Sequence, residues 1–301
     1  MDVSIIIVNY KTLPLIVNCI NSIIQKSTGI SYEIIVVDNN SSDNFSECLK
    51  EKFGSLVTCV QLAENIGFGR ANNEGVKIAK GRNILFLNPD TLLINDAIKI
   101  LSDYLDANPK VGACGGNLYN EDMKPTHSYS MLLPSIAWEL NCCLLGYLEK
   151  ILWGKNAQFN NTKRTRNVAY ICGADLMVKQ IVLKRVRPFS DKFFMYYEDT
   201  ELSYRIRKQG FIIASIPEAK IQHLEGKSMQ RSKRINSKRM INVEYGLSTY
   251  YSLHANRLSN KVIQLLRLLR LGAKRCIFKE DGLTKELYIK CKEIILNYSI
   301  S

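Results

Sequence analysis

Short apolar runs rich in Val and Ile alternate with helix-like stretches through the first 110 residues. Three of these runs are VSIIIVNY, EIIVVD and NILFL, and none of them alternates apolar with polar residues. A strand that is apolar at nearly every position is buried on both faces, which is typical of a parallel sheet covered by helices. The pattern therefore predicts an α/β fold with a mostly parallel central sheet flanked by helices. In open sheets of this kind, ligands bind at the carboxyl ends of the strands.

The same patterns place individual elements along the chain. We expect strands at residues 3–10, 33–38, 55–61 and 83–87. We expect helices at residues 13–25, 72–79, 96–107 and 199–209. Gly210 then takes the position just after a helix that glycine prefers. The run VAYICGADLMV indicates buried strand material interrupted at Gly173.

The positive charge of the chain is concentrated in one segment. The chain carries 41 Lys and Arg against 28 Asp and Glu, a net charge of +13. Residues 1–226 hold 25 basic and 23 acidic residues, whereas residues 227–280 hold 13 and 2. A basic block of this kind is typical of contact with a polyanionic partner, either an anionic membrane surface or nucleic acid. We therefore expect a nearly neutral main body, 1–226, and a basic helical C-terminal region, 227–301.

The segment that starts at Asn260 favours the membrane. In NKVIQLLRLLRLGAKRCIF, Arg267, Arg270 and Lys274 share one helical face. A separate apolar stripe consists of Val262, Leu265, Leu266, Leu269, Ala273 and Cys276. A basic amphipathic helix of this kind lies in a bilayer interface. Two alternatives stay open: the helix packs on the main body with its basic residues in water, or it binds nucleic acid, for which no motif accompanies the charge.

The nine cysteines predict free thiols in a reducing compartment. They are odd in number and scattered, and no C-x-x-C pair is present, so neither a zinc ribbon nor thioredoxin-like chemistry is indicated. The N-terminal apolar run, residues 3–8, is too short for a signal peptide or a span. Residues 131–153 are apolar but interrupted by charged and polar side chains, which does not suit a transmembrane helix. We expect a cytoplasmic protein.

Acidic residues stand at the ends of two predicted strands. Asp38 ends EIIVVD, and Asp90 ends ILFLNPD. A carboxylate fixed at the tip of a buried strand suits a hard divalent cation, Mg²⁺ or Mn²⁺, although Asp, Asn and Pro are also common in plain turns. His223, in IQHLEGKS, would be a ligand beside such a site and a structural residue elsewhere.

A second pair of carboxylates follows an aromatic run. Glu198 and Asp199 come directly after FFMYY and open a predicted helix. The helix dipole alone favours acidic residues in a first turn. The aromatic wall, however, would desolvate a carboxylate and raise its pKa toward that of a general base.

The glycine-rich segment ENIGFGRANNEG does not fit a dinucleotide-binding fingerprint. It contains Gly67-x-Gly69, but Asn72 stands where that fingerprint needs its third glycine.

Taken together, these segments resemble family-2 inverting glycosyltransferases. The segments that carry the resemblance, in order, are VSIIIVNY, VVDNNSSD, ENIGFGRANNEG, LFLNPDT, CGADLMV, FFMYYEDTELSYRIRKQGF and HLEGKS. They are most similar to the bacterial rhamnosyltransferase branch that builds cell-surface polysaccharides. The resemblance implies a GT-A catalytic domain at 1–226, with a nucleotide-binding half at 1–110 and an acceptor-side half at 111–226. It also implies a nucleotide-diphosphate-sugar donor and a divalent metal.

The resemblance also implies roles for residues in the donor pocket. Asp38 matches the carboxylate that hydrogen-bonds the pyrimidine base, and Asn9 lies in the same base pocket. The residues implied to line the nucleotide and its phosphates are Asn65, Gly67, Arg70 and Asn72.

Metal and catalytic roles follow by position as well. In NPD, Asp90 matches the metal-binding aspartate, and Asn88 replaces the first aspartate of the D-x-D motif, which leaves one fewer charge for the metal. His223 matches a histidine near the metal and the leaving diphosphate. Asp199 matches the catalytic base, with Glu198 beside it.

The expected reaction is a single in-line displacement with inversion. The expected donor is dTDP-L-rhamnose, and UDP-hexoses stay open because one carboxylate does not separate thymine from uracil. The expected acceptor is a polyprenyl-diphosphate-linked sugar or a polysaccharide at the cell membrane. We expect residues 227–301 to hold the enzyme peripherally on the inner face of that membrane, with residues 131–153 shaping the acceptor mouth. No nucleic-acid partner is expected.

Two readings from other classes fit less well. A sugar nucleotidyltransferase would carry a glycine-rich phosphate loop soon after its first strand, where this chain has NYKTLPLIVNC without a glycine. A non-catalytic sugar-nucleotide-binding protein would not need the full set of Asp38, Asp90, Asp199 and His223.

Overall fold

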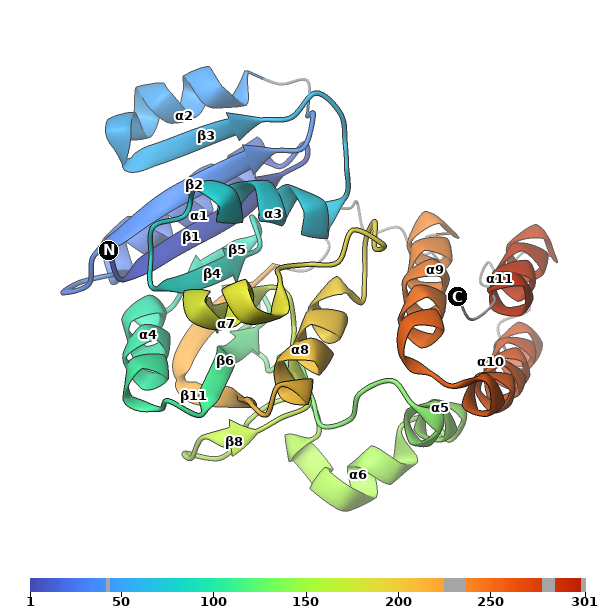
Figure 1. Ribbon diagram of the computed structural model, residues 1–301. Helices are drawn as coiled ribbons and strands as arrows, with labels where there is room; N and C mark the ends of the chain where they lie inside the picture. Colours follow the sequence, from blue (N-terminus) through green and yellow to red (C-terminus); the bar gives the residue numbers. More distant parts are fainter. Residues whose placement is uncertain (42–43, 225–236, 278–284, 299–301) are drawn as a thin grey trace.

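The chain folds into one large mixed sheet with helices on both faces and a layer of three helices near its C-terminus (Figure 1). The computed structural model describes residues 1–41, 44–224, 237–277 and 285–298. The strands are β1 Val3–Asn9, β2 Tyr32–Asp38, β3 Val57–Gln61, β4 Asn83–Leu87, β5 Thr91–Leu93, β6 Val111–Tyr119, β7 Tyr129–Ser130, β8 Arg166–Asn167, β9 Tyr170–Ile171, β10 Asp175–Lys179 and β11 Ile212–His223. The helices are α1 Leu13–Lys26, α2 Phe45–Phe53, α3 Phe68–Ile78, α4 Ala97–Ala107, α5 Ile136–Cys143, α6 Tyr147–Trp153, α7 Gln180–Val186, α8 Glu198–Lys208, α9 Ser237–His254, α10 Arg257–Ile277 and α11 Lys285–Asn297.

The main sheet is mostly parallel, as the sequence predicts. Its path among the described residues is β3-β2-β1-β4-β10-β6-β11-β5, with β8 paired to β11. β3, β2, β1 and β4 run parallel, whereas β10 is antiparallel to both of its neighbours, β4 and β6. β6 and β11 therefore point the same way as β4. As a result, the carboxyl ends of these strands and the start of β10 meet at one edge of the sheet.

Two hydrophobic cores cover the faces of this sheet. α1, α2 and α4 pack on one face, where Ile16, Leu49 and Leu101 are fully buried. α3, α7 and α8 pack on the other, where Ala71 and Leu202 are fully buried. The uninterrupted apolar strands are explained by this double coverage, because both faces of each strand contact a helix layer.

Two predicted elements begin two or more residues away from their expected first residue. α3 begins at Phe68, four residues before the predicted start, because Gly69 lies inside its first turn and does not break it. A Cβ at Gly69 would lie 3.0 Å from the Phe189 Cβ and 3.4 Å from the Glu198 Cβ, so this glycine permits close packing. β3 begins at Val57, because the preceding residues form a short 3₁₀ turn, Gly54–Leu56.

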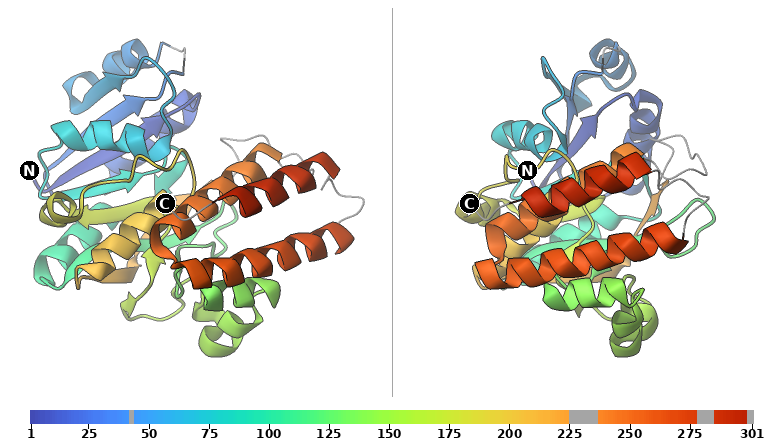
Figure 2. Two further views of the ribbon diagram at one scale, coloured as in Figure 1. Left: turned by 45° about the vertical axis from the view of Figure 1, so that its right-hand side comes forward. Right: turned by 90° about the vertical axis from the view of Figure 1, so that its right-hand side faces the viewer.

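A third core joins the C-terminal helices to the main body. Phe193, just before α8, packs with Leu247, Tyr250 and Tyr251 of α9 and with Ile263 of α10. Figure 2 shows α9, α10 and α11 lying together beside the sheet domain, with α5 along α10. The two parts predicted to meet at residue 226 therefore share a packed interior. Residues 227–236 and 278–280 of the predicted basic block lie outside the described residues.

Two of the three residues on the predicted basic face of α10, Arg267 and Arg270, point inward, which none of the three sequence readings gave, whereas Lys274 is exposed. Arg267 is only 2% exposed and donates to the Glu244 carboxylate of α9 at 2.5 Å. Arg270 lies 3.5 Å from the Glu139 carboxylate of α5. These two arginines therefore face buried glutamates and not water. Within the described residues, no helix is long and apolar enough to cross a membrane, and all eight described cysteines are free thiols.

Candidate active site

Asn9, Asp38 and Gln61 meet at the ends of β1, β2 and β3, where the sequence predicts the base pocket. The parallel register sets Asn9 opposite Asp38 and Asp38 opposite Gln61. Asn9 Nδ2 donates to Asp38 Oδ1 at 2.8 Å, and Gln61 Nε2 donates to Oδ2 at 3.0 Å. The backbone N–H of Ser41 also donates to Oδ2, at 3.1 Å. An ionised carboxylate accepts about four hydrogen bonds, so Oδ1 retains capacity for one more donor.

The loop before α3 is tied to the residue that follows Asp38. Asn39 Nδ2 donates to Asn65 Oδ1 at 2.9 Å, and Asn39 Oδ1 accepts from the backbone N–H of Ile66 at 2.9 Å. Gly67 has a φ of 93°, and a Cβ there would lie 2.4 Å from the Phe194 carbonyl oxygen. Only glycine fits this position, because it lies in the left-handed region and touches another backbone. The structure thus brings Asn65 and Gly67 beside Asp38.

Arg70 and Asn72 make contacts within the protein. Both Nε and Nη2 of Arg70 donate to the Asp191 carbonyl oxygen, at 2.8 and 2.5 Å. Asn72 is buried, and its Nδ2 donates to the Phe68 carbonyl oxygen at 3.0 Å. Arg70 therefore fastens α3 to the loop that leads into α8, and the role implied for these two residues in phosphate binding stays a prediction.

The NPD turn and the end of β11 bring three of the predicted residues together. His223 Nε2 lies 3.3 Å from Asp90 Oδ1 and 3.4 Å from Asn88 Nδ2. The pairing of β11 with β5 sets His223 opposite Thr91, and Thr91 Oγ1 donates to the Asn88 carbonyl oxygen at 2.7 Å. No group of three or more His, Cys, Asp or Glu side chains placed to hold a metal occurs in the part of the chain that the structure describes. A cation here would have Asp90 as its protein carboxylate.

Asp175 is a residue at this edge that the sequence analysis missed. It is the first residue of β10, opposite Leu87 of β4, and it is completely buried. Its Oδ2 accepts from the Gly116 N–H at 2.6 Å, whereas Oδ1 has no hydrogen-bond partner. Burial raises the pKa of Asp175 to about 7, and the Gly116 N–H and the nearby His223 oppose that rise. The signal in the sequence was a single acid inside the otherwise apolar run CGADLMV.

Asp199 stands in the first turn of α8 with both carboxylate oxygens oriented. Oδ2 accepts from the Gly173 N–H at 2.7 Å, and Oδ1 accepts from the N–H and hydroxyl of Thr200 at 2.6 and 3.1 Å. Gly173 permits this approach, because a Cβ there would lie 3.1 Å from Asp199 Oδ2. Burial raises the pKa of the Asp199 carboxyl, while these donors and His127 lower it. Asp199 is thus a partly desolvated carboxylate in a fixed orientation.

Glu198 is the buried neighbour of Asp199. Its Oε2 has no hydrogen-bond partner, and burial together with the Asp199 charge raises its pKa to about 8. Two adjacent desolvated carboxyls do not both ionise readily. The donors around Asp199 favour its charged form, whereas burial and the Asp199 charge favour the protonated form of Glu198.

A strained turn sets this acidic pair in place. Tyr196 and Tyr197, immediately before α8, have φ angles of 72° and 69°. Each such residue costs about 1–3 kcal/mol and persists only where its surroundings enforce it. α9 supplies that enforcement, because a Cβ on Gly246 would lie 2.4 Å from the Tyr196 carbonyl oxygen. α9 therefore supports the turn that precedes Glu198 and Asp199 directly.

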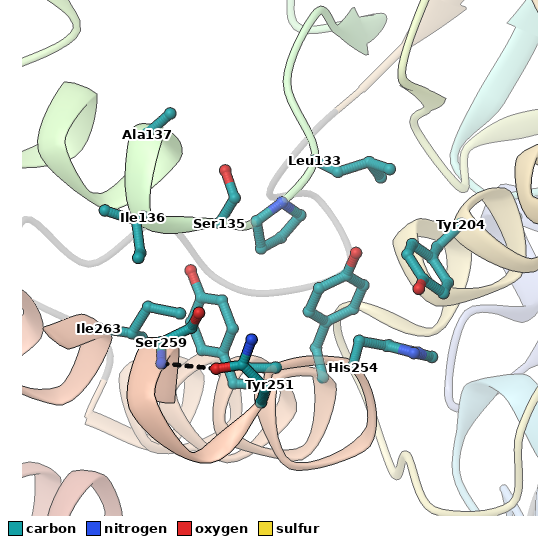
Figure 3. Close-up of a pocket in the computed structure, with 13 residues that line it drawn as sticks. Leu133, Ser135, Ile136, Ala137, Tyr204, Tyr251, His254, Ser259 and Ile263 are labelled. Carbon is teal, nitrogen blue, oxygen red and sulfur yellow. Dashed lines mark hydrogen bonds between the residues drawn. The ribbon is translucent and has the colours of Figure 1, made fainter. Parts of the chain in front are cut away.

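A separate cavity of about 460 Å³ opens between α8, α9 and α10. Figure 3 shows Tyr204, Tyr251 and His254 around it, opposite the segment that carries Leu133 and Ser135. None of the predicted site residues lines it. Part of the segment expected to shape an acceptor mouth, residues 133–137, lines this cavity, and that role stays a prediction.

Comparisons with known proteins identify the family to which the chain belongs. The model of the family "Glycosyl transferase family 2" matches residues 4–186. The chain is 28% identical over 223 residues to a low-salt glycan biosynthesis hexosyltransferase of Haloferax volcanii, covering 70% of this chain and 64% of the relative. It is 22% identical over 210 residues to an N-acetylglucosaminyl-diphospho-decaprenol L-rhamnosyltransferase of Mycobacterium tuberculosis, covering 66% and 68%. It is 28% identical over 212 residues to a dTDP-rhamnosyl transferase of Shigella flexneri, covering 69% and 64%. The match thus spans about two thirds of these relatives, and slightly less for two of them.

Solved structures show the same fold over nearly the whole chain. The Staphylococcus aureus TarS fragment 1–349 in complex with UDP-GlcNAc aligns with a TM-score of 0.61 at 13% identity, covering 100% of this chain and 82% of that one. A mannosyltransferase from Pyrobaculum calidifontis in complex with GDP-Man and Mn²⁺ aligns with a TM-score of 0.59 at 16% identity, covering 98% and 84%. Because the family model matches more than half of the chain, the chain belongs to glycosyl transferase family 2 and is a glycosyltransferase of GT-A fold, similar to the rhamnosyltransferases of that family.

Proposed function

We propose that this enzyme transfers L-rhamnose from dTDP-L-rhamnose to a lipid-linked or cell-surface polysaccharide acceptor, with inversion at the anomeric carbon. The observation that carries the proposal is the Asp199 carboxylate, which donors from Gly173 and Thr200 hold in a fixed orientation beside the buried Glu198. The donor and acceptor are suggested by two relatives, named a dTDP-rhamnosyl transferase and an N-acetylglucosaminyl-diphospho-decaprenol L-rhamnosyltransferase.

The chemistry requires one base and one leaving group. Asp199 removes the proton of the acceptor hydroxyl, and the oxygen attacks the anomeric carbon from the face opposite the diphosphate. The new C–O bond forms as the bond to the nucleoside diphosphate breaks, and the leaving group keeps the electron pair. General-base assistance of this kind contributes about 10²–10⁴ in rate. The raised pKa of Glu198 favours its neutral form, which adds no second negative charge to oppose the incoming hydroxyl oxygen.

The residues at the NPD turn fit a divalent cation that is completed by its substrate. Mg²⁺ and Mn²⁺ are commonly bound through one or two carboxylates together with phosphate oxygens and water. Asp90 supplies one carboxylate and His223 a nitrogen 3.3 Å from it, which suits such an incomplete protein site. Bound there, Mg²⁺ or Mn²⁺ would offset the charge that develops on the departing diphosphate.

The pocket around Asp38 supports a pyrimidine nucleotide. In a nucleotide, thymine and uracil each keep one ring N–H, and Asp38 Oδ1 has one acceptor position left beyond its bond to Asn9. A UDP-hexose is therefore the second candidate donor, because both bases offer the same N–H. The acceptor proposal places the enzyme on the inner face of the cell membrane.

The first test is a thermal shift of the purified chain. The donors to compare are dTDP-L-rhamnose, UDP-glucose, UDP-galactose, UDP-N-acetylglucosamine and GDP-mannose, each with and without Mg²⁺ or Mn²⁺. A donor present at roughly 100 times its Kd stabilises the fold by about 2.7 kcal/mol. A metal-dependent shift with dTDP-L-rhamnose alone supports the proposed donor. A shift with UDP-sugars alone selects the second candidate, and a shift with GDP-mannose alone contradicts the assignment of Asp38.

The second test removes the proposed base. Asp199→Asn keeps the shape of the side chain but cannot take a proton, so transfer should fall by roughly 10²–10⁴ while the donor-induced thermal shift persists. Asp191→Asn is the matched control, because Asp191 lies on the exposed loop nearby and its side chain has no proposed role. Turnover by Asp199→Asn equal to that of the control would remove Asp199 from the mechanism.

A further inference from the structure

The outer face of α10 presents apolar side chains to solvent. Leu258, Val262, Leu265 and Leu269 are spaced by four, three and four residues, so they lie on one side of the helix. Leu265 and Leu269 are 59% and 60% exposed. Half or more of each leucine thus remains in contact with water, although apolar side chains of a surface helix ordinarily face a core.

The orientation of α10 is fixed from its opposite side. Arg267 and Arg270 reach inward to the buried carboxylates of Glu139 and Glu244, and the Arg270 guanidinium lies 5.8 Å from the Trp138 ring centroid. Rotating the helix to bury its leucines would expel these arginines and leave two buried carboxylates without an arginine partner, which is strongly unfavourable. The exposed leucines are therefore a consequence of how α10 is anchored.

α5 lies next to α10, and α5, α6 and their link also carry exposed apolar side chains. α5 runs beside α10, with Cys143 Sγ 3.4 Å from the Leu266 carbonyl oxygen (Figure 2). Leu144 and Leu145, in the link between α5 and α6, are exposed, Leu145 by 89%. Ile151 of α6 is also exposed. We call this surface, formed by the exposed side chains of α5, α6, their link and α10, the α5–α6–α10 face.

Every exposed charge on these three helices is positive. The acidic residues of α5 and α6, Glu139 and Glu149, are buried, and α10 contains no acidic residue. The exposed charged side chains are Lys150, Arg257, Lys261, Lys274 and Arg275. Lys261 lies between Leu258 and Leu265 on the same side of α10. Apolar groups with a positive rim and no exposed carboxylate are complementary to anionic lipid headgroups above acyl chains.

We propose that the α5–α6–α10 face is the surface by which the enzyme binds an anionic lipid bilayer, with the leucines of α10 inserted at the interface. This deepens the proposed function, on which it rests for the lipid-linked nature of the acceptor. Two-fold contact of the face with a second copy of the chain would bring like charges such as Lys261 together. A bilayer provides the opposite charge and a fluid apolar layer, so the observations favour lipid over self-association.

The test is co-flotation of the full chain with vesicles of phosphatidylglycerol and phosphatidylcholine in roughly equal parts. The double variant Leu265→Ser, Leu269→Ser should lower the partition coefficient by roughly tenfold for each leucine. The matched control is Ile181→Ser, because Ile181 is 71% exposed on α7, outside the face. It should bind as the unmodified chain does. Lys261→Gln should weaken binding to these vesicles and leave weak binding to pure phosphatidylcholine unchanged.

Several outcomes would overturn the proposal. Equal flotation of the leucine variant and the Ile181→Ser control would mean that α10 does not insert. Equal binding of the unmodified chain to neutral and anionic vesicles would remove the role of the basic rim. A dimer in solution that the leucine substitutions dissociate would identify the face as a self-interface instead. Sedimentation velocity measures the oligomeric state of the same samples.

The vesicle experiment is independent of the proposed reaction. The leucine variant should keep the donor-induced thermal shift of the unmodified chain, because Leu265 and Leu269 lie outside the residues that form the donor pocket. Absence of that shift in the unmodified chain would defeat the proposed function and leave vesicle binding standing. Loss of vesicle binding with an intact donor shift would defeat only the lipid-binding face.

Discussion

Gly246→Ala tests whether α9 positions the catalytic turn. The added Cβ would lie 2.4 Å from the Tyr196 carbonyl oxygen, whereas ordinary contact begins at about 3.4 Å. The turn or the helix must therefore move by about 1 Å. Tyr196 lies two residues before Glu198, and a displacement of roughly 1 Å at a catalytic group costs about 10² in rate. We expect turnover to fall by roughly that factor while the donor KM changes little.

The control for this substitution is Gly272→Ala in α10. No heavy atom lies within 4 Å of a Cβ at Gly272, so alanine there should stabilise the helix by roughly 0.5–1 kcal/mol and leave turnover unchanged. Both variants are assayed for transfer with the donor that shifts the melting temperature, and their unfolding is followed by urea denaturation. Gly246→Ala with wild-type turnover and the same gain in stability as Gly272→Ala would refute the contact between α9 and the turn as a positioning device.

Two further predictions concern buried charge. Burial raises the folded-state pKa of Glu198 to about 8, so the unmodified chain loses stability as pH rises through that value, by at most about 1.4 kcal/mol per pH unit. Glu198→Gln should remove this loss. In urea denaturation, the free energy of unfolding of the variant relative to that of the unmodified chain should therefore increase between about pH 5 and about pH 9. If that difference in free energy does not change with pH, Glu198 ionises freely in the folded chain. Arg267→Met leaves Glu139 and Glu244 with one arginine and should cost about 3–5 kcal/mol, whereas Lys274→Met at the exposed end of α10 should cost almost nothing. Equal melting temperatures of these two variants would contradict the buried ion-pair cluster.

The site residues at strand ends were predictable from sequence, because the carboxyl ends of parallel strands lie at the same edge of a sheet. Asn9, Asp38 and Asp90 each end or follow an apolar run. The parallel register of β1 with β2 and β4 then brings the ends of these strands to the same edge of the sheet. Asp175 was not predictable in the same way, because it begins a strand and stands inside an apolar segment. Nothing in the neighbouring residues shows that β10 runs antiparallel and therefore starts at the edge where the other strands end.

The direction of α10 could not be obtained from its own sequence. A helical wheel shows that Arg267 and Arg270 share a face, but not what that face contacts. Their partner Glu139 belongs to α5, more than a hundred residues earlier in the chain. The apolar segment that contains Glu139 does not show from its own sequence that this acid pairs with α10. The sequence around Gly246 likewise does not show which residue contacts this glycine. Only the structure shows that Tyr196 packs against it.

The support that α9 gives to the Tyr196–Tyr197 turn has a consequence for how the enzyme would lose activity on heating. The turn is held by the small core around Phe193 and Tyr250, whereas the sheet is held by two much larger cores. Release of the small core frees the two tyrosines to leave their left-handed conformation, and the acidic pair moves with them. We therefore expect loss of activity at a lower temperature than melting of the sheet. Spectroscopic signals dominated by the sheet would then still report a folded protein after the acidic pair has left its position.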